Sequence, residues 1–206
     1  NGAHVHTQTR CINARRSKGL WHMNMERSDG SLFSIRAKAL VNAAGPWVAK
    51  FIRDDLKLDS PYGIRLIQGS HLIVPKLYEG ENAFILQNED QRIVFTIPYL
   101  ERFTIIGTTD REYQGDPSKV TITEDEIDYL LKVVNEHFKK QLSRSDIVRT
   151  YSGVRPLCND ESDNPSAVTR DYTLSLSGSA EEAPILSVFG GKLTTYRKLA
   201  ESAMTH

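Results

Sequence analysis

The chain has 206 residues, in which 26 basic and 26 acidic side chains leave no formal net charge. A chain of this length can bury a substantial core and form one or two domains. Because the charges balance, the composition indicates neither nucleic acid nor an anionic membrane surface as a partner, and any basic site has to be local. Cys11 and Cys158 are far apart and lack CxxC spacing, which argues against a disulfide framework or a zinc site and favours a reducing compartment.

The apolar stretches and the two ends of the chain bound its class further. No apolar stretch approaches the ~18 residues of a membrane-spanning helix, and the start lacks the charged-then-apolar plan of a signal peptide. A soluble, cytoplasmic chain is therefore expected. The sequence opens at Asn1 in a strand-like pattern and closes at His206 just after a helical pattern has begun, which we interpret as an excised piece of a longer protein.

Alternating residues near the start predict a small antiparallel meander from Val5 to about Arg36. Its strands read HVHTQTRC, GLWHMNMER and SLFSIR, and the second places Trp21, Met23 and Met25 on one face. In the first strand, His4 and His6 share the predicted face. No third ligand accompanies these histidines, so no metal is assigned.

The next stretch, KALVNAAGPWVAKFI, predicts a strand followed by a tight turn and a helix. Residues 39–42 form a short apolar strand, Ala44 and Gly45 allow close backbone approach, and Pro46 suits the first turn of a helix. Nucleotide-binding folds use such junctions. Small residues serve plain strand–helix packing as well, so both interpretations stand at this point.

The middle of the chain predicts an antiparallel sheet with one helix. Its strands read IRLIQGSHLIVP, AFILQNED, RIVFTIPYL and FTIIGTTD. Thr123 and Glu126 have capping-box spacing and begin a helix that ends near Lys140, with a buried stripe of Ile127, Leu130, Leu131, Val134 and Phe138. Two further strands, DIVRTYSGVRP and DYTLSLS, flank the polar loop CNDESDNPSAVTR.

Residues 184–203, PILSVFGGKLTTYRKLAESA, predict a second strand-to-helix junction, with Gly190 and Gly191 at the turn. The first amides of a helix lack intrahelical partners and lie at the positive end of its dipole, which suits an anion or a flavin oxygen. Lys192 would add a full charge there. A P-loop is excluded because Leu186 and Leu193 stand where that motif needs Gly and Ser or Thr. Plain packing is the alternative.

Seven stretches in order, VNAAGPWV, IRLIQGSHLIVP, LQNEDQRIVF, IIGTTD, TYSGVRPLCNDES, AVTRDYTL and SVFGGKLTTYRKLAE, resemble the FAD-dependent glycerol-3-phosphate dehydrogenases, particularly the bacterial aerobic type. The resemblance implies a mixed α+β and α/β fold. Residues 1–58 would end a partial Rossmann-like FAD-binding domain, 59–182 would form an antiparallel-sheet substrate domain with a helix, and 183–206 would be the returning FAD-domain strand and helix. The family's GxGxxG unit and C-terminal helical domain are absent, which implies an internal fragment, colourless and inactive by itself.

The resemblance also implies a reaction and assigns residues to it. FAD would oxidise sn-glycerol 3-phosphate to dihydroxyacetone phosphate by taking a hydride, and quinone would accept the electrons. The catalytic candidates are His71 and Lys192, and the candidates for holding the phosphate are Arg155 and Arg170. Which of His71 and Lys192 is the base stays open. The flavin neighbours that it implies are Ala44, Gly45, Gly190, Gly191, Thr194 and Thr195.

Without the resemblance, each site residue has an ordinary alternative. Either arginine could form a surface ion pair, and a single histidine on a strand is usually structural. The longer parent is expected to lie on the cytoplasmic face of the inner membrane through parts missing here, and its dimerisation stays open. Two other functions remain: a non-catalytic module that captures a phosphorylated metabolite through Arg155, Arg170 and Lys192, and a flavin amine oxidase, against which the paired arginines argue.

Overall fold

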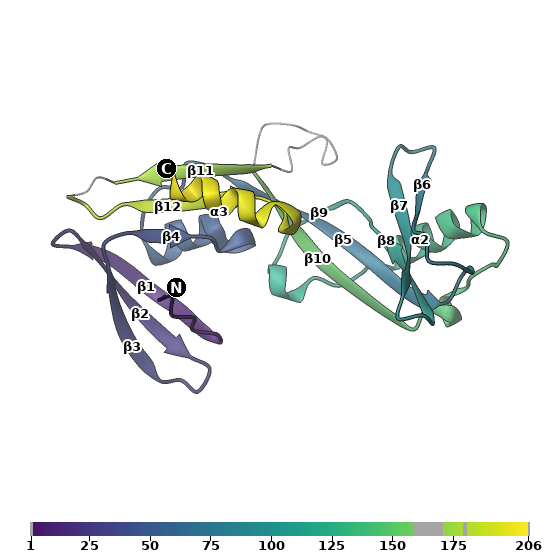
Figure 1. Ribbon diagram of the computed structural model, residues 1–206, viewed down its shortest axis with the longest axis horizontal. Helices are drawn as coiled ribbons and strands as arrows, with labels where there is room; N and C mark the ends of the chain where they lie inside the picture. Colours follow the sequence, from purple (N-terminus) through teal and green to yellow (C-terminus); the bar gives the residue numbers. More distant parts are fainter. Residues whose placement is uncertain (1, 159–170, 179–180, 206) are drawn as a thin grey trace. The chain divides into compact units, whose positions relative to one another are not determined.

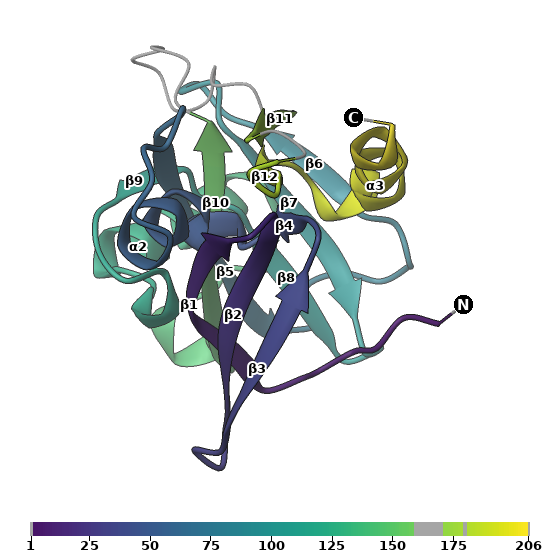
Figure 2. The same cartoon turned by 90° about the vertical axis from the view of Figure 1, so that its left-hand side faces the viewer.

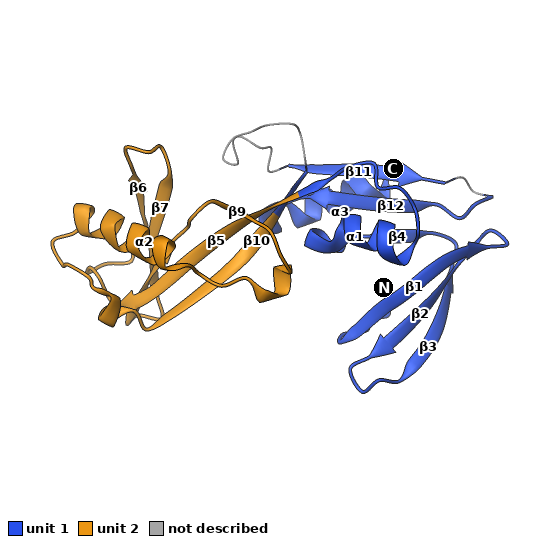
Figure 3. Ribbon diagram, turned by 180° about the vertical axis from the view of Figure 1, so that it is seen from behind, with its two compact units in different colours: residues 1–64, 156–160, 169–206 blue, residues 65–155, 161–168 orange. Residues whose placement is uncertain are grey.

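The computed structural model describes residues 2–158, 171–178 and 181–205. The chain divides into two compact units, coloured separately in Figure 3. Unit 1 comprises residues 1–64, 156–160 and 169–206, and unit 2 comprises residues 65–155 and 161–168. The domain boundaries expected from the sequence stay a prediction. The class is mixed α+β with antiparallel sheets and few helices, as expected.

Unit 1 contains the predicted meander, whose three strands lie side by side in Figures 1 and 2. The strands are β1 (Thr9–Ser17), β2 (Leu20–Arg27) and β3 (Leu32–Ala37). Trp21 and Met23 are buried on one face, as predicted, together with Ala14, Leu56 and Ile185. The indole Nε1 of Trp21 donates a hydrogen bond to the Pro184 carbonyl at 2.9 Å, so this large ring is also satisfied as a donor.

The predicted bounds of the first strand were wrong. β1 begins at Thr9 rather than His4 and continues to Ser17, and residues 3–6 form neither helix nor strand. The hairpin turn sets this register, because Lys18 and Gly19 adopt positive φ and Ser17 pairs with Leu20. Since the paired ladder ends at Thr9, opposite Arg27, His4 and His6 share no strand face.

The second sheet of unit 1 contains both strand-to-helix junctions. Its order is β11 (Tyr172–Ser177), β12 (Ile185–Gly190), β4 (Leu40–Asn42), with β12 parallel to β4 and antiparallel to β11. Helical segments follow β4 and β12, as predicted. They are η1 (Gly45–Trp47), α1 (Val48–Lys50) and η2 (Phe51–Asp55) after β4, and η5 (Leu193–Thr195) and α3 (Tyr196–Met204) after β12.

Unit 2 contains a larger, antiparallel sheet in the order β10-β5-β8-β7-β6, with β9 paired to β5. The strands are β5 (Ile64–Pro75), β6 (Phe84–Gln87), β7 (Ile93–Tyr99), β8 (Phe103–Gly107), β9 (Arg111–Tyr113) and β10 (Arg149–Cys158). The strands expected in this region are present, and β9 was not predicted. The register places His71 opposite Gly107, which in turn lies opposite Phe95.

Helix α2 (Glu124–His137) packs against one face of this sheet. The residues buried between them are Leu72, Val74, Leu86, Val94 and Ile106 from the sheet and Leu130, Leu131, Val133 and Val134 from the helix. Thr123 caps the helix in the predicted capping box with Glu126. Short 3-10 turns precede and follow α2, η3 (Pro117–Lys119) and η4 (Arg144–Asp146).

The opposite face of the unit 2 sheet carries His71. Side chains alternate along a strand, so the neighbours of the buried residues point away from α2. Several of these side chains are apolar and more than a third exposed, namely Ile85, Ile93, Phe95, Ile97 and Tyr99. In the part of the chain that the structure describes, no helix has the length and apolar character needed to cross a bilayer.

Candidate active site

His71 lies on β5 between two features that fix its ring. Gly107 is its cross-strand neighbour on β8, and a Cβ built on Gly107 would come within 2.2 Å of the imidazole Cδ2. A glycine is therefore needed to make room for the ring. On β10, the ring of Tyr151 is stacked on the imidazole, with 4.5 Å between centroids and 3° between planes. The position of the imidazole is thus determined by one strand on each side of β5.

The surroundings of His71 keep it uncharged. Burial, followed by the positive charge of Arg155, lowers its pKa from 6.5 to about 4. The imidazole is therefore neutral at physiological pH and can accept a proton, although it is a weaker base than an exposed histidine. Its Nδ1 is buried and has no hydrogen-bond partner among the described residues. A buried nitrogen in that state is uncommon, and a bound hydroxyl group would satisfy it.

Arg155 is held in a defined orientation by the loop that follows β8. Its Nη1 donates to Asp110 Oδ1 at 2.7 Å, and its Nη2 donates to Thr108 Oγ1 at 2.9 Å. Gly69 of β5 leaves space for this guanidinium, because a Cβ there would lie 2.5 Å from Nη2. The Arg155 side chain is 29% exposed, so this is a partly buried and oriented cation rather than a solvated surface ion pair.

The second expected phosphate ligand, Arg170, lies outside the described residues. The close approach of Arg155 and Arg170 stays a prediction. Within unit 2, the structure brings together His71, Tyr151 and Arg155 with Thr108 and Asp110.

Unit 1 supplies the expected flavin neighbours at one edge of its sheet. Because β4 and β12 are parallel, their carboxyl ends lie at the same edge, where open α/β sheets bind ligands. Gly45 follows β4 with φ of +54°, and no atom comes within 4 Å of a Cβ built there. Gly190 has φ of +78°, and a Cβ there would lie 2.7 Å from the Asp171 carbonyl oxygen. Only glycine fits this turn, and the backbone beside Gly45 is open.

Lys192 directly precedes the turn η5 and is exposed. No side chain caps this turn in the described structure. The amide and the hydroxyl of Thr195 both donate to the Lys192 carbonyl, at 3.1 and 3.3 Å, and Thr194 is exposed. At the other junction, the Ala44 amide donates to Asn42 Oδ1 at 3.3 Å. The residues at this edge fit part of a flavin site, with backbone amides and one cation available to negative oxygens.

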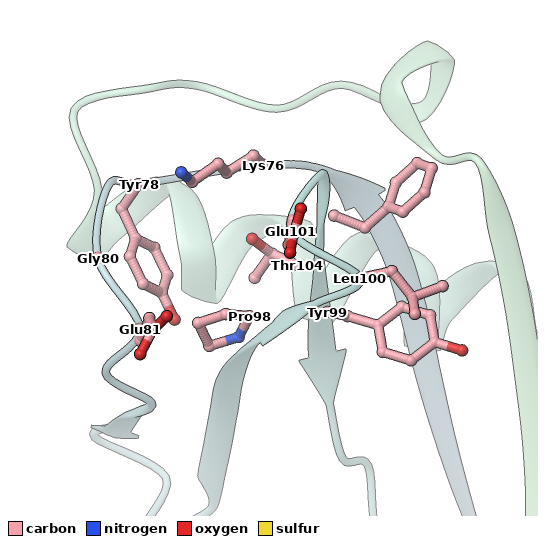
Figure 4. Close-up of a pocket in the computed structure, with 10 residues that line it drawn as sticks. Lys76, Tyr78, Gly80, Glu81, Pro98, Tyr99, Leu100, Glu101 and Thr104 are labelled. Carbon is pink, nitrogen blue, oxygen red and sulfur yellow. The ribbon is translucent and has the colours of Figure 1, made fainter.

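Unit 2 also contains a hollow, which is drawn in Figure 4. It has a volume of about 400 Å³ and is lined by residues that include Lys76, Tyr78, Glu81, Tyr99 and Glu101. Phe103 and Tyr99, which line the hollow, are cross-strand partners in the row that includes Pro75. This row is four residues along the strands from the row that contains His71. It contains none of the predicted site residues.

Several residues of this arrangement were not predicted. Tyr151 follows the same strand alternation as Arg155, which is four residues later on β10, so a strand pattern anchored on Arg155 could have identified it. Thr108 and Asp110 belong to the stretch IIGTTD, which supports the resemblance but does not indicate their contact with Arg155. The roles of Gly69 and Gly107 could not be predicted from the sequence, because each glycine makes room for a side chain on a neighbouring strand.

Unit 2 thus supplies a neutral, partly buried imidazole near an oriented arginine, and unit 1 supplies glycine turns at a parallel sheet edge, which is typical of flavin-binding oxidoreductases. A family model described as FAD dependent oxidoreductase matches residues 1–197, and the chain belongs to this family. It is 86% identical over 203 residues to the glycerol-3-phosphate dehydrogenase of Pseudomonas tolaasii, covering 98% of this chain and 40% of that relative.

Two further relatives support the same placement. The aerobic glycerol-3-phosphate dehydrogenase of Escherichia coli K12 is 62% identical over 204 residues, which are 98% of this chain and 41% of the relative. The solved structure of the glycerol-3-phosphate dehydrogenase from Bacillus halodurans complexed with FAD aligns with a TM-score of 0.79 and 29% identity, covering 96% of this chain and 37% of that chain. The predicted family, fold class and cofactor FAD are thereby confirmed. The chain spans about 40% of the length of the curated relatives it matches.

Proposed function

We propose that this chain is part of an FAD-dependent glycerol-3-phosphate dehydrogenase that oxidises sn-glycerol 3-phosphate to dihydroxyacetone phosphate. The reaction removes a hydride from C2 and a proton from the C2 hydroxyl group. When bound, FAD supplies the hydride acceptor. The protein must hold the phosphate, accept the proton and stabilise the negative charge that develops.

His71 is assigned to the proton transfer. Its neutral imidazole has a buried nitrogen that lacks a partner among the described residues, which suits an interaction with the C2 hydroxyl group. Stacking on Tyr151 restrains the ring, so that little rotational freedom is lost on forming the productive hydrogen bond. Transfer of the hydroxyl proton to His71 forms an imidazolium ion, and because its pKa is low this ion gives up the proton readily afterwards.

Arg155 is assigned to the substrate phosphate. The ion pair with Asp110 and the hydrogen bond to Thr108 fix its guanidinium plane, and a planar fork matches phosphate oxygens better than a point charge does. Arg170 is proposed as the second phosphate ligand. Lys192 is proposed to balance the negative charge that arrives with the hydride or to orient the C2 oxygen.

One observation carries this proposal: unit 2 holds a ring-stacked His71, whose buried Nδ1 has no partner among the described residues, and an Arg155 guanidinium fixed by Asp110 and Thr108. A module that only captured a phosphorylated metabolite would need the arginine but not a neutral imidazole held in a fixed position by Tyr151 and Gly107. An amine oxidase would need no oriented cation for a phosphate. The high identity to proteins named glycerol-3-phosphate dehydrogenase supports this choice among the three functions.

The proposal extends to the cellular setting expected from the resemblance. Electrons pass to quinone, and the longer protein lies peripherally on the cytoplasmic face of the inner membrane. The isolated chain, which lacks a GxGxxG unit, is proposed to retain no stoichiometric FAD and to be inactive. Yellow, FAD-containing preparations of the isolated chain would contradict that last statement.

Anaerobic bleaching of the flavin tests the proposal in the full-length protein that carries this chain. Glycerol 3-phosphate should bleach the flavin absorbance, whereas glycerol and glycine should not, and His71→Asn should slow bleaching without releasing FAD. Binding of glycerol 3-phosphate without bleaching would favour the capture module. Bleaching by glycine but not by glycerol 3-phosphate would favour the amine oxidase.

A further inference from the structure

Glu126, in the first turn of α2, is a buried carboxylate with an unusual number of donors. It is 6% exposed and accepts hydrogen bonds from three side chains outside its own helix turn. These donors are Gln68 Nε2 at 2.7 Å, Ser70 Oγ at 2.9 Å and Thr109 Oγ1 at 2.5 Å. It also accepts from the amide and the hydroxyl of Thr123, at 2.9 and 3.1 Å.

Helix capping accounts for only part of this arrangement. A capping box needs the Thr123 amide as a donor to the Glu126 side chain, and nothing more from the rest of the protein. The other donors come from β5 and from the connection between β8 and β9. Since a buried carboxylate is costly unless its oxygens are satisfied, these donors keep it in place, and it keeps them in place in turn.

Each of the three outside donors is adjacent in sequence to a residue of the candidate active site. Gln68 precedes Gly69, which leaves space for the Arg155 guanidinium. Ser70 precedes His71 on β5, and strand alternation sends the two side chains to opposite faces. Thr109 lies between Thr108 and Asp110, the two residues that hold the Arg155 guanidinium.

The network also reaches the third strand of the site. The Ser70 hydroxyl lies 2.9 Å from the hydroxyl of Ser152, and it donates to Glu126, so Ser152 donates to Ser70. Ser152 follows Tyr151, the residue whose ring is stacked on His71. The Ser70 amide donates to Thr109 Oγ1 at 2.9 Å, which joins β5 directly to the β8–β9 connection.

We infer that Glu126 is a positioning residue of the active site, whose carboxylate holds β5, the β8–β9 connection and β10 at the spacing that sets His71, Tyr151 and Arg155. The inference rests on the proposed function for its kinetic consequence, but its geometric content concerns unit 2 alone. Removing the carboxylate leaves buried hydroxyl and amide donors without their acceptor, and these donors can be satisfied again only if the strands shift.

The first test is independent of substrate and flavin. NMR titration of the isotopically labelled chain follows the His71 ring in the wild type and in Glu126→Gln. Strand displacement should admit water to the imidazole and separate it from Arg155, raising its pKa from about 4 toward 6.5. Among the described residues, the charge of Arg155 and the ring of Tyr151 act on this imidazole, and Asp110 is paired with Arg155. Simple loss of a negative charge would lower the pKa instead, so the sign separates the two causes.

Two control variants match what Glu126→Gln changes besides position. Asp125→Asn removes one negative charge from the same helix turn at an exposed position. Val133→Ala removes buried volume from α2 and destabilises unit 2 without touching the network. Both should leave the His71 titration unchanged. Ser152→Ala removes only one hydroxyl of the network and should raise the pKa of His71 by less than Glu126→Gln, which provides a measurement even if the glutamate variant fails to fold.

The second test measures turnover in the full-length protein. Glu126→Gln should lower kcat for glycerol 3-phosphate by about 10- to 100-fold, the effect of misplacing a catalytic group by about 1 Å. Asp125→Asn and Val133→Ala should keep kcat near the wild-type value below their unfolding temperatures. An unchanged His71 titration and kcat in Glu126→Gln, with only a lower unfolding temperature, would overturn the inference. If the wild type oxidised no glycerol 3-phosphate, the proposed function would fail, and the titration would still decide the role of Glu126.

Discussion

The rings of His71 and Tyr151 are parallel to within 3°, with their centroids 4.5 Å apart. The histidine belongs to β5 and the tyrosine to the neighbouring β10, so the stack is a contact between adjacent strands. Burial raises the pKa of the Tyr151 hydroxyl, which therefore stays protonated at physiological pH. The tyrosine contributes a neutral surface that both restrains the imidazole and shields it from water.

The stack predicts different outcomes for two substitutions of Tyr151. Tyr151→Phe keeps the ring and should leave the pKa of His71 near its low value. Tyr151→Leu removes the aromatic face and exposes the imidazole, so the pKa should rise toward 6.5. NMR titration of His71 in both variants provides the measurement. Equal titration curves for the leucine and phenylalanine variants would show that the stack does not control solvent access to the ring.

Gly107 predicts a sharp contrast with another glycine of the same sheet. Gly107→Ala would place a Cβ 2.2 Å from the His71 ring, so the ring or the strand must shift, at a cost of about 1–3 kcal/mol in the free energy of unfolding. No atom comes within 4 Å of a Cβ built on Gly153, which lies between Tyr151 and Arg155 on β10. Gly153→Ala is therefore the matched control and should unfold like the wild type in urea. Similar stabilities for the two variants would contradict the close approach at Gly107.

Local patterns predicted the elements of unit 2 well, because they depend on neighbours in sequence. The capping box at Thr123 and Glu126 marked the start of α2 correctly, and apolar periodicity identified its buried stripe. The same pattern gave no sign that Glu126 also accepts hydrogen bonds from β5 and the β8–β9 connection. The donors on β5 are 56 to 58 residues away in sequence, and only the tertiary fold brings them to the helix.

The candidate site was predicted only as far as family motifs named its residues. The resemblance predicted His71 and Arg155 as site residues. The structure adds that the positive charge of Arg155 contributes to the low pKa of His71. Tyr151 reads as an ordinary strand aromatic, and its role depends on the register between β10 and β5. The wrong start of β1 has a similar origin, since alternation is clear in residues 4–11 but pairing with β2 begins only at Thr9.

The low pKa of His71 predicts how stability depends on pH. The unfolded chain takes up a proton near pH 6.5, while the folded chain resists protonation until about pH 4. The unfolded state therefore binds more protons across this window, and the contribution of His71 to stability falls as the pH decreases from 6.5 to 4. Urea unfolding at several pH values should show a smaller loss in His71→Gln than in the wild type. The exposed His4→Gln variant should retain the wild-type dependence.

The fixed orientation of Arg155 predicts that lysine cannot replace it. A lysine ammonium is a point charge and cannot bond Asp110 and Thr108 while presenting a planar fork. In the full-length protein, Arg155→Lys should raise KM for glycerol 3-phosphate by about 10-fold or more, in line with loss of a hydrogen bond between charged groups. The phosphate is remote from C2, so kcat should change less than KM. A larger fall in kcat than rise in KM would place Arg155 at the reacting atoms.

Lys192 predicts the opposite kinetic pattern. It precedes η5 at the carboxyl edge of the unit 1 sheet, directly after the Gly190-Gly191 turn. Oxidation of C2 transfers negative charge toward the acceptor and its oxygens, and a fixed cation interacts more strongly with that charge than with the neutral ground state. Lys192→Ala should therefore lower kcat by about 10²- to 10³-fold, the scale for removing one preorganised electrostatic donor, with a smaller effect on KM.

Lys198 supplies the matched control for this last prediction. It is an exposed lysine on α3, so Lys198→Ala removes the same charge from the same unit at a different position along the helix. Its kcat should remain near the wild-type value. Steady-state kinetics must be accompanied by measurement of FAD content, because loss of cofactor would lower kcat without any change in the chemical step. If Lys192→Ala retained both FAD and the wild-type kcat, GGKLTTYR would be a packing turn, in which Gly190 makes room for the Asp171 carbonyl and Gly191 for the Leu199 side chain.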